Sequence, residues 1–460
     1  MRAGVAAGHP TTAQTGADVL ARGGSAVDAA VAMMLVSCAA ETIFTGLGGG
    51  GFATVYDAAT RQVRCVDFFV SVPGLGGLQA GPATEIEVIF IGQRVPYEIG
   101  PGTVAVPGIP AGAHHLWRTW GRLPWPEVVE PGLRASFGTP FPETHARLLP
   151  RVAAAMAVGE GSQVFRRPDG SLLRAGDPLR HVDHHRAYEL LADDPAAFYS
   201  GAYAEALVRS VADGGAVSQE DLDAYRVIES EPQCVTVDSG TVHARGDDLD
   251  DLLETLAQAA RTMPGDPRTD PTSALALVAA LRAHDKRAET TNIVAVDDQG
   301  DGCVITTSLG LGSGAYVEGY GVHLNSMIGE GELIRGLMQP GQRMGSMMSP
   351  LVALDEHGQI AAIAGAAGGS RIRPALVQSV LRMLRGETPQ AAIDAPRLNA
   401  LPDLVRLEPG FSAEVLEALQ AAGEQIAVAD HLDTYFGGVS ALSPLGGGAD
   451  PRRSGFVIMS

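Results

Sequence analysis

The chain has 460 residues, of which 45% are hydrophobic and 19% are charged, so it can bury a large core. Its formal net charge of −20 at pH 7 opposes a phosphate backbone or an anionic membrane surface, because both attract clustered lysine and arginine. We therefore expect a folded, enzyme-sized protein with no nucleic-acid partner and no membrane partner.

The cysteines predict a protein without a metal or cofactor. They are far apart, form no CxxC pair and have no histidine at metal-ligand spacing, so neither a zinc site nor a redox pair is indicated. No signal peptide is visible at Met1–Val5, and the apolar stretch Val27–Ala40 is too short to span a bilayer. Free thiols in a chain of this kind favour a cytoplasmic location. The cysteines are Cys38, Cys65, Cys234 and Cys303.

Two helices are predicted near the start of the chain. The first is His9–Arg22, which ends at Gly23-Gly24. Ser25 then begins the second, with Asp28 in the position of a capping box. Apolar residues of the second helix recur at helical spacing and predict a buried face. They are Val27, Val31, Met34, Leu35 and Cys38.

A glycine-rich run, Thr45–Phe52, follows the second helix. Consecutive glycines allow close backbone packing or positive φ angles. The run lacks both the GxGxxG and the GxxxxGK[ST] patterns, so we favour this structural role over phosphate binding. Two strands are predicted after it, Phe52–Tyr56 and Val63–Phe69.

The middle of the chain, from about Glu189 to Lys286, is predicted to be mostly helical and polar. Its charge run Asp247–Asp251 and its proline-containing stretch Met263–Pro271 are predicted to be solvated surface and loop. No internal repeat is evident in this segment or elsewhere.

The sequence pattern changes at Thr290, from mostly helical segments before it to strand-like segments after it. Asn292–Val296 and Cys303–Ser308 alternate as strands around the turn Asp297–Asp301, which predicts a hairpin. Two β-rich segments flanked by helical ones favour a layered α/β sandwich over alternating βαβ units. Further strands are predicted at Leu351–Leu354 and Ile360–Ala364, and helices at Pro374–Leu384 and Ala413–Ala422.

Thr290 and Thr291 stand at the start of this hairpin. By itself the pair is ordinary, because threonine is common in strands. A hydroxyl needs a positioned base to act as a nucleophile, and an N-terminal threonine carries one in its own α-amine, with a pKa of about 8. A terminus in mid-chain requires the Glu289–Thr290 peptide bond to break first.

An ordered series of motifs resembles the γ-glutamyltransferase family over nearly the whole chain. The first part is Gly8-His9-Pro10, Gly23–Ala30 and Gly46–Phe52, followed by Val106-Pro107-Gly108 and Gly121–Trp125. The last part is Thr290-Thr291, Ser346–Pro350, Gly368–Arg371 and Asp394–Arg397. No single motif is specific, but the series in this order is.

The resemblance implies the four-layer αββα sandwich of N-terminal-nucleophile hydrolases, an α+β fold made as one precursor and then cut in two. Residues 1–289 would form the large subunit and residues 290–460 the small catalytic subunit, and the two would stay associated. Thr290 Oγ would attack the scissile carbonyl to form an acyl-enzyme, with Thr291 in support.

The resemblance also implies the residues around the nucleophile. Ser308 stands where the family has a second threonine that orients the terminal amine. Gly368 and Gly369 would donate backbone N–H groups to the oxyanion. Asn292 replaces the histidine that usually follows the threonine pair, and the family's Pro-Pro-Ser-rich strand is not recognisable around Val242–Leu253.

The chain departs from the family where the glutamyl group is held. The expected arginine falls on Phe69, and the aspartate that binds the substrate ammonium falls on Ile328. Of the paired serines, Ser346 remains and the second is Met347. Losing two ionic contacts, each worth about 1.5–3 kcal/mol, predicts poor binding of glutathione. The other expected substrate-binding residues are Asn325 and Arg371, although Arg371 fits a structural role too and Phe69 fits core filling equally well.

Three interpretations of function stay open. We favour a self-cleaving hydrolase that acts on an amide or oxalyl-type C–C bond of a small non-glutathione substrate, a chemistry that fits antibiotic biosynthesis. The second is a genuine γ-glutamyl hydrolase or transpeptidase acting on glutathione or γ-glutamyl amides. The third is a non-catalytic homologue that never cuts itself.

Overall fold

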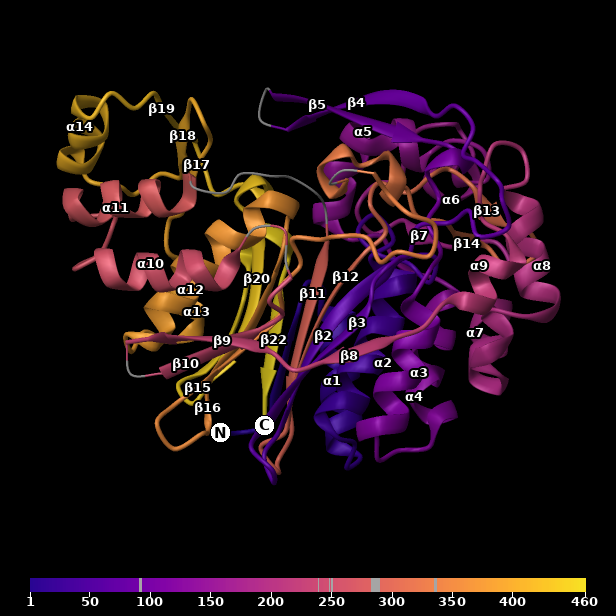
Figure 1. Cartoon of the computed structure of the whole chain (residues 1–460), viewed down its shortest axis with the longest axis horizontal. Helices are drawn as coiled ribbons and strands as arrows, with labels where there is room; N and C mark the ends of the chain where they lie inside the picture. The colour runs from indigo at the N-terminus through magenta and orange to yellow at the C-terminus, as the bar shows by residue number, and fades with distance from the viewer. Residues whose placement is uncertain (91–92, 239, 248, 250, 283–289, 335–336) are drawn as a thin grey trace.

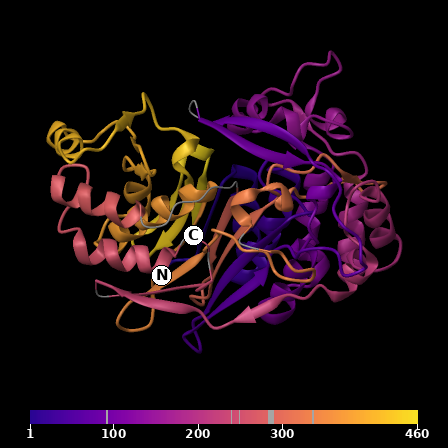
Figure 2. The same ribbon diagram turned by 45° about the horizontal axis from the view of Figure 1, so that its top comes forward.

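Two stacked β-sheets lie at the centre of the molecule, and helices cover both outer faces (Figure 1). The structure is a computed structural model that describes residues 1–90, 93–238, 240–247, 249, 251–282, 290–334 and 337–460. This arrangement confirms the predicted αββα sandwich. Figure 2 shows the same layers from a second direction.

Within the described residues, the first sheet has seven antiparallel strands. Strands from before and after Thr290 both contribute to it, and β1, from before Thr290, lies between two strands from after it. Their order is β22 (Phe456–Met459), β1 (Gly4–Ala7), β11 (Thr291–Val296), β12 (Gly302–Ser308), β2 (Gly50–Asp57), β3 (Gln62–Phe68) and β8 (Ile228–Ser230).

The second sheet is also antiparallel, and the chain enters it directly from the first. Edge strand β8 continues into the edge strand of the second sheet, so one segment spans both layers (Figure 1). The order is β21 (Gly446–Ala449), β20 (Gly438–Ser443), β16 (Ile360–Ala367), β15 (Leu351–Leu354), β10 (Gly240–Ala244) and β9 (Gln233–Val237).

Successive residues of β11 face opposite sides of the first sheet, as the twofold period of a strand requires. Ile293 and Ala295 pack in the core under the helices, whereas Val294 and Val296 pack against the second sheet. Strand β12 alternates in the same way. Even-numbered positions of this hairpin therefore face the space between the sheets.

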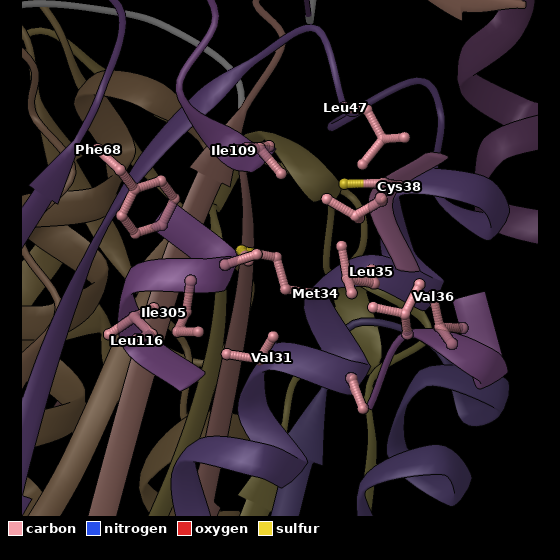
Figure 3. Packing of buried hydrophobic residues seen from close by; sticks show 14 of the residues in the cluster. Val31, Met34, Leu35, Val36, Cys38, Leu47, Phe68, Ile109, Leu116 and Ile305 are labelled. Atoms are coloured by element: carbon pink, nitrogen blue, oxygen red, sulfur yellow. The ribbon is translucent and has the colours of Figure 1, made fainter. Parts of the chain in front are cut away.

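Helix α2 (Ala26–Ala40) forms the centre of the helical layer on the first sheet. Its predicted capping box is confirmed, because Ser25 Oγ accepts from the Asp28 N–H at 3.0 Å and Asp28 Oδ2 accepts from the Ser25 N–H at 2.9 Å. Every residue of the helix is buried, not only the predicted face. Figure 3 shows residues of α2 packed with Phe68, Ile109 and Ile305 from the elements around it.

The remaining elements complete the two helical layers and the loops above the sheets. The helices on the same side of the first sheet as α2 are α1 (Pro10–Ala21), α3 (Ile109–Trp120), α4 (Trp125–Ser136), α7 (His184–Asp193), α8 (Gly201–Ser210) and α9 (Gln219–Ala224) (Figure 1). The second sheet carries α10 (Leu252–Thr262), α11 (Pro271–Arg282), α12 (Ile372–Leu384), α13 (Pro389–Asp394) and α14 (Ala413–Ala421). Smaller elements are β4 (Thr84–Phe90), β5 (Gln93–Ile99), β6 (Thr139–Pro140), α5 (Glu143–Met156), α6 (Gly161–Phe165), β7 (Pro178–Leu179), β13 (Tyr316–Val317), β14 (Val322–His323), β17 (Leu398–Ala400), β18 (Val405–Leu407) and β19 (Ile426–Val428).

The segment predicted to be mostly helical, from about Glu189 to Lys286, also contains the three strands β8, β9 and β10. These strands are short, and β8 is exposed along its whole length. A short exposed strand has no apolar alternation, so the sequence gives little sign of it. No helix in the described ranges is long and apolar enough to cross a membrane.

Candidate active site

Thr290 lies immediately before β11, at the edge of the sandwich where several central strands begin or end. Its side chain is buried, with only 2% of the residue exposed. Thr291 pairs with Thr307 across the β11–β12 ladder, so Thr290 and Ser308 are the next residues of the two strands. Both occupy even positions and therefore face the space between the sheets.

Thr290 and Ser308 line a small pocket of about 10 Å³, which is roughly the room that one water molecule needs. Four other predicted site residues line it as well: Phe69, Ser346, Met347 and Gly369. The structure therefore brings residues from four distant parts of the sequence together. The other residues of the lining are Met327, Glu330, Leu333, Met348 and Ile372.

Gly368 directs a backbone donor at the predicted nucleophile. Its N–H group donates to Thr290 Oγ over 2.8 Å. Its φ angle is +127°, and a Cβ atom there would lie 2.9 Å from the Gly437 Cα atom. Only glycine satisfies both conditions. A fixed N–H donor beside a nucleophilic oxygen is the kind of group that stabilises an oxyanion.

Thr291 faces the helical layer, away from the small pocket. Its Oγ donates to Glu41 Oε2 at 2.9 Å, and Thr12 Oγ donates to Glu41 Oε1 at 2.7 Å. Glu41 follows α2 and is 1% exposed. Burial lowers the pKa of the neighbouring His9, although the Glu41 carboxylate acts in the opposite direction. Thr291 thus connects the start of β11 to a buried carboxylate.

Asn292 faces the second sheet and is 3% exposed. Its Oδ1 atom accepts from Thr306 Oγ at 2.8 Å, so the side chain joins β11 to β12. A Cβ atom on Gly365 of β16 would lie 1.9 Å from the same Oδ1 atom. The amide therefore packs directly on the backbone of the second sheet.

Arg453 holds the backbone of Thr290. Its Nη1 donates to the Thr290 carbonyl at 3.3 Å, and its guanidinium lies 4.9 Å from the centre of the Phe44 ring. Arg453 is 7% exposed, and it shares a second small pocket of about 20 Å³ with Thr290 and Glu41. A buried cation and a buried carboxylate therefore both lie next to Thr290.

Phe69 is both a pocket wall and a core residue. It is 1% exposed, and its ring stacks on Phe52 with centroids 5.3 Å apart. The Arg245 guanidinium lies 3.6 Å from the centre of the Phe52 ring on β2. Where the family's arginine is expected, the pocket therefore has a hydrocarbon wall.

Arg245 also fixes the segment that carries Ser346 and Met347. It donates to the carbonyl oxygens of Ser346 at 3.5 Å and Met348 at 3.2 Å, while the Leu249 N–H donates to the Ser346 carbonyl at 2.9 Å. Ser346 Oγ accepts from the Met348 N–H at 3.1 Å. The position of this pocket wall thus depends on a buried arginine of the preceding half of the chain.

Three predicted substrate-binding residues do not line the small pocket. Asn325 Nδ2 donates to the carbonyls of Gly48 and Ala105, each at 2.8 Å, so its amide is engaged by backbone. Ile328 is half-buried, and the neighbouring Met327 lines the pocket instead. Arg371 Nε donates to the carbonyl of Tyr435 at 3.2 Å.

Three residues that matter for this geometry were not predicted from the sequence. Glu41 is a charged residue directly after a mostly apolar helix, which is a signal for a buried partner. Arg453 lies in the Asp-Pro-Arg-Arg run near the end of the chain, and Arg245 lies two residues before the charge run Asp247–Asp251. Neither arginine has a sequence pattern that indicates its contacts.

A four-layer αββα sandwich with a buried threonine at the start of a central strand defines the class of N-terminal-nucleophile hydrolases. The model of the gamma-glutamyltranspeptidase family matches residues 12–249 and 248–460. The chain therefore belongs to the γ-glutamyltranspeptidase family, and it is an enzyme of this group of hydrolases and transferases.

Relatives with curated names agree with this assignment. The chain is 25% identical to the glutathione hydrolase proenzyme of Bacillus subtilis (strain 168), over 99% of this chain and 91% of the relative. It is 25% identical to the acylase ACY 1 proenzyme of Pseudomonas sp. (strain V22), over 92% and 87%. The crystal structure of the cephalosporin acylase from Bacillus halodurans superposes with a TM-score of 0.81 at 22% identity, over 99% and 95% of the two chains, and so shares the fold.

Proposed function

We propose that this enzyme cuts itself before Thr290 and then uses Thr290 as an N-terminal nucleophile on a small acyl substrate. The observation that carries the proposal is the buried Thr290 hydroxyl, which accepts the Gly368 N–H at 2.8 Å and shares a pocket with Ser308. Glu289, on the other side of the proposed cut, lies outside the described residues. Residues 1–289 and 290–460 would be the two associated subunits.

The proposed reaction uses the hydroxyl and the freed α-amine of Thr290 together with two backbone N–H groups. The freed α-amine of Thr290 takes the proton from Oγ, which attacks the acyl carbonyl, and the N–H groups of Gly368 and Gly369 stabilise the oxyanion. The scissile bond then breaks, and the leaving group takes the proton from the α-ammonium group. Water attacks the acyl-enzyme in the second half of the reaction and restores Thr290.

We propose a small acyl group because the pocket beside Thr290 is narrow and mostly apolar. Its volume is about 10 Å³, and its walls include Phe69 and Met347, which stand where the family has an arginine and a serine for the γ-glutamyl group. The bond cleaved is an amide or an oxalyl-type C–C bond, and the context that fits is specialised-metabolite (antibiotic) biosynthesis in the cytoplasm. The names of the relatives, one an acylase and one a cephalosporin acylase, support an acyl substrate other than glutathione.

The second candidate is a γ-glutamyl hydrolase or transpeptidase. It is favoured by one observation, the similarity to proteins named glutathione hydrolase proenzymes. Anilides of γ-glutamate and of short acids such as acetate and oxalate separate the two candidates. We expect release of aniline from a short acyl anilide at about tenfold or more the rate from γ-glutamyl anilide. The reverse order would favour the second candidate.

The proposal is tested by intact-mass measurement of the purified protein with changes at Thr290. We expect wild type and Thr290→Ser to give two fragments, one beginning at residue 290, because both retain a hydroxyl. Thr290→Ala should stay a single chain. Thr241→Ala, on an outer strand of the second sheet, is the control and should be cut like wild type. A cut Thr290→Ala protein would refute the assignment of the nucleophile.

A further inference from the structure

Self-cleavage needs a proton acceptor that Thr290 cannot supply from its own backbone. Until the bond before it breaks, the nitrogen of Thr290 belongs to an amide, whose lone pair is delocalised and takes up no proton from Oγ. The α-amine that serves as the base of the cut enzyme does not yet exist. Another group near Thr290 must therefore accept the Oγ proton during the first cut.

Glu41 is a buried carboxylate close to Thr290, and only 1% of the residue is exposed. Its two oxygens accept hydrogen bonds from Thr12 Oγ at 2.7 Å and Thr291 Oγ at 2.9 Å. Within the parts of the chain that the structure describes, no lysine or arginine forms an ion pair with it. An ion-paired carboxylate gives up its cationic partner when it accepts a proton, whereas Glu41 has no such partner to lose.

Glu41 and Thr290 line the same pocket of about 20 Å³, where β1 ends and β11 begins. Gly8 makes this shared pocket possible. It follows β1, in which Ala7 pairs with Ile293 of β11, and it also lines the pocket. A Cβ atom on Gly8 would lie 3.0 Å from Glu41 Oε2. The missing side chain therefore leaves the carboxylate open to the pocket.

This pocket has the room and the polar groups that one water molecule needs. A water requires about 10–15 Å³ and two to four polar partners. Asn292 lines the pocket, and its buried Nδ2 atom has no hydrogen-bond partner among the described residues. Glu41 contributes acceptors and Thr290 contributes a hydroxyl group. A water held by Asn292 would lie between the donor and the acceptor of the proton.

The other ionisable groups around Thr290 are less suited to accept its proton. Asp450 lines the same pocket but is paired with two arginines, at 2.7 and 3.1 Å. Arg453 also lines it, and a guanidinium group stays protonated. His9 does not line the pocket. Glu330 lines the first small pocket, whose mostly apolar walls offer a water fewer partners.

We infer that Glu41 accepts the proton of Thr290 Oγ during self-cleavage, through one water molecule in this pocket. The inference rests on the proposed cut before Thr290. The water takes the Oγ proton and passes one of its own to Glu41, while Oγ attacks the carbonyl carbon of Glu289. The C–N bond then breaks, and the proton returns from Glu41 through the water to the leaving nitrogen.

The products of this step are a free α-amine on Thr290 and an ester between the carbonyl of residue 289 and Thr290 Oγ. A second water hydrolyses the ester, which restores the hydroxyl group and releases the carboxylate of Glu289. Glu41 ends the sequence ionised, as it began. The two pieces then carry the nucleophile and the amine that the proposed acyl transfer uses.

The rate of self-cleavage in freshly synthesised chains, followed by intact mass over time, tests the inference. We expect Glu41→Gln to be cut more slowly than wild type by a factor of about 10²–10⁴, because it keeps the shape but removes the proton acceptor. Asp221→Asn is the matched control. Asp221 is 2% exposed and accepts from Ser218 Oγ at 2.7 Å, outside both small pockets, so its loss should lower the thermal midpoint without slowing the cut. A Glu41→Gln chain that is cut at the wild-type rate would overturn the inference.

Two shorter side chains separate the charge of Glu41 from its packing. Glu41→Asp and Glu41→Asn have the same shape, so a purely structural role would slow both equally. We expect the aspartate variant to be cut about tenfold or more faster than the asparagine variant. Equal rates would overturn the inference. So would slower cleavage of Glu330→Gln than of Glu41→Gln, because it would place the acceptor in the first pocket.

Gly8→Ala tests the place of the water. The added methyl group enters the pocket and keeps the carboxylate, so we expect the cut to slow by a factor of about ten or more. Gly46→Ala is its control, because a Cβ atom there would meet its nearest neighbour, Leu309, at an ordinary 3.6 Å outside the pocket. Cleavage of Gly8→Ala at the wild-type rate would contradict the relay through a water.

Failure of this inference is distinguishable from failure of the proposed function. A wild-type chain that stays uncut would refute the proposed function and the inference with it. A wild-type chain that is cut before Thr290, together with a Glu41→Gln chain that is cut equally fast, would overturn the inference alone.

Discussion

Thr290 is held at two of its atoms. Its Oγ accepts the Gly368 N–H, and its carbonyl accepts the Arg453 guanidinium. The two bonds orient both the hydroxyl and the backbone before any reaction. Preorganised donors of this kind lower a barrier because they need no rearrangement when charge develops.

Gly368→Ala should impair the proposed self-cleavage. A Cβ atom at this position meets the Gly437 Cα atom and opposes the φ angle of +127°, so the N–H donor would shift away from Thr290 Oγ. We expect the rate of self-cleavage to fall by a factor of about 10²–10³, which intact-mass measurement over time will show. Gly358→Ala is the control, because Gly358 also has a positive φ angle, +72°, but lies in the turn between β15 and β16. Cleavage of Gly368→Ala at the wild-type rate would contradict this role.

Phe69→Leu should widen the pocket of Thr290 and move the acyl preference toward longer chains. The smaller side chain leaves room beside Met347, at a stability cost of about 1–3 kcal/mol. Anilides of increasing acyl length measure the preference. Phe68→Leu is the matched control, because Phe68 is equally buried but packs under the helices. This control variant should lose stability without a change in its acyl preference. If both variants had the same acyl preference, Phe69 would not determine which acyl group the pocket accepts.

At the scale of elements, the β11–β12 hairpin assigns different tasks to its two faces. The face toward the second sheet carries Thr290, Asn292 and Ser308, and the face toward the helices carries Thr291, which bonds to Glu41. A slip of one residue in register would exchange the two faces. The bond between Thr291 and Glu41 opposes such a slip.

Thr291→Val should destabilise the protein and also slow self-cleavage. The change keeps the shape but leaves the buried Glu41 with one hydroxyl donor fewer among those described, at a cost of about 1–3 kcal/mol. Thr12→Val removes the other hydroxyl donor and is the matched control. We expect similar losses in thermal midpoint but slower cleavage only for Thr291→Val. If both variants cut equally fast, Thr291 has no part in placing Thr290.

Elements with strong local patterns could be predicted from the sequence. The capping box of α2 and the hairpin of β11 and β12 depend on neighbouring residues, and both are confirmed. The substrate-binding residues were harder to predict than these elements. Asn325 and Arg371 match family motifs, but their polar atoms bond to backbone far away in sequence. Such long-range contacts leave no periodic pattern, and for the same reason the contacts of Arg245 were not predicted.

At the scale of the whole molecule, buried histidines should make stability depend on pH. Burial lowers the pKa of His145 to about 3, of His181 to about 4 and of His323 to about 3, and it lowers that of His184 well below 6.5. Below about pH 6.5 the unfolded chain binds protons that the folded chain excludes. The free energy of unfolding is therefore complete above pH 6.5 and decreases as the pH falls toward 4.

Thermal midpoints at pH 7.5 and pH 5 test this dependence. We expect a lower midpoint at pH 5 and a smaller decrease for His181→Phe, because an aromatic ring without a titrating group replaces the imidazole that packs against Phe165. His357→Phe is the control, since His357 is exposed and should leave the decrease unchanged. A midpoint that is equal at both pH values would contradict the effect of burial.

The order of the strands determines whether the two pieces of a cut chain could separate and assemble again. Strand β1 is bonded between β22 and β11, and β12 is bonded to β2, while in the second sheet β10 is bonded to β15. A cut before Thr290 would therefore leave two pieces joined along four ladders. Neither piece would contain a complete sheet, and separation would require all four ladders to open. Folding would therefore have to precede the proposed cut, and a molecule that unfolded afterwards would have lost the connected chain that guided its assembly. The lifetime of the cut enzyme would therefore be set by its rate of unfolding and not by the equilibrium between folded and unfolded chains.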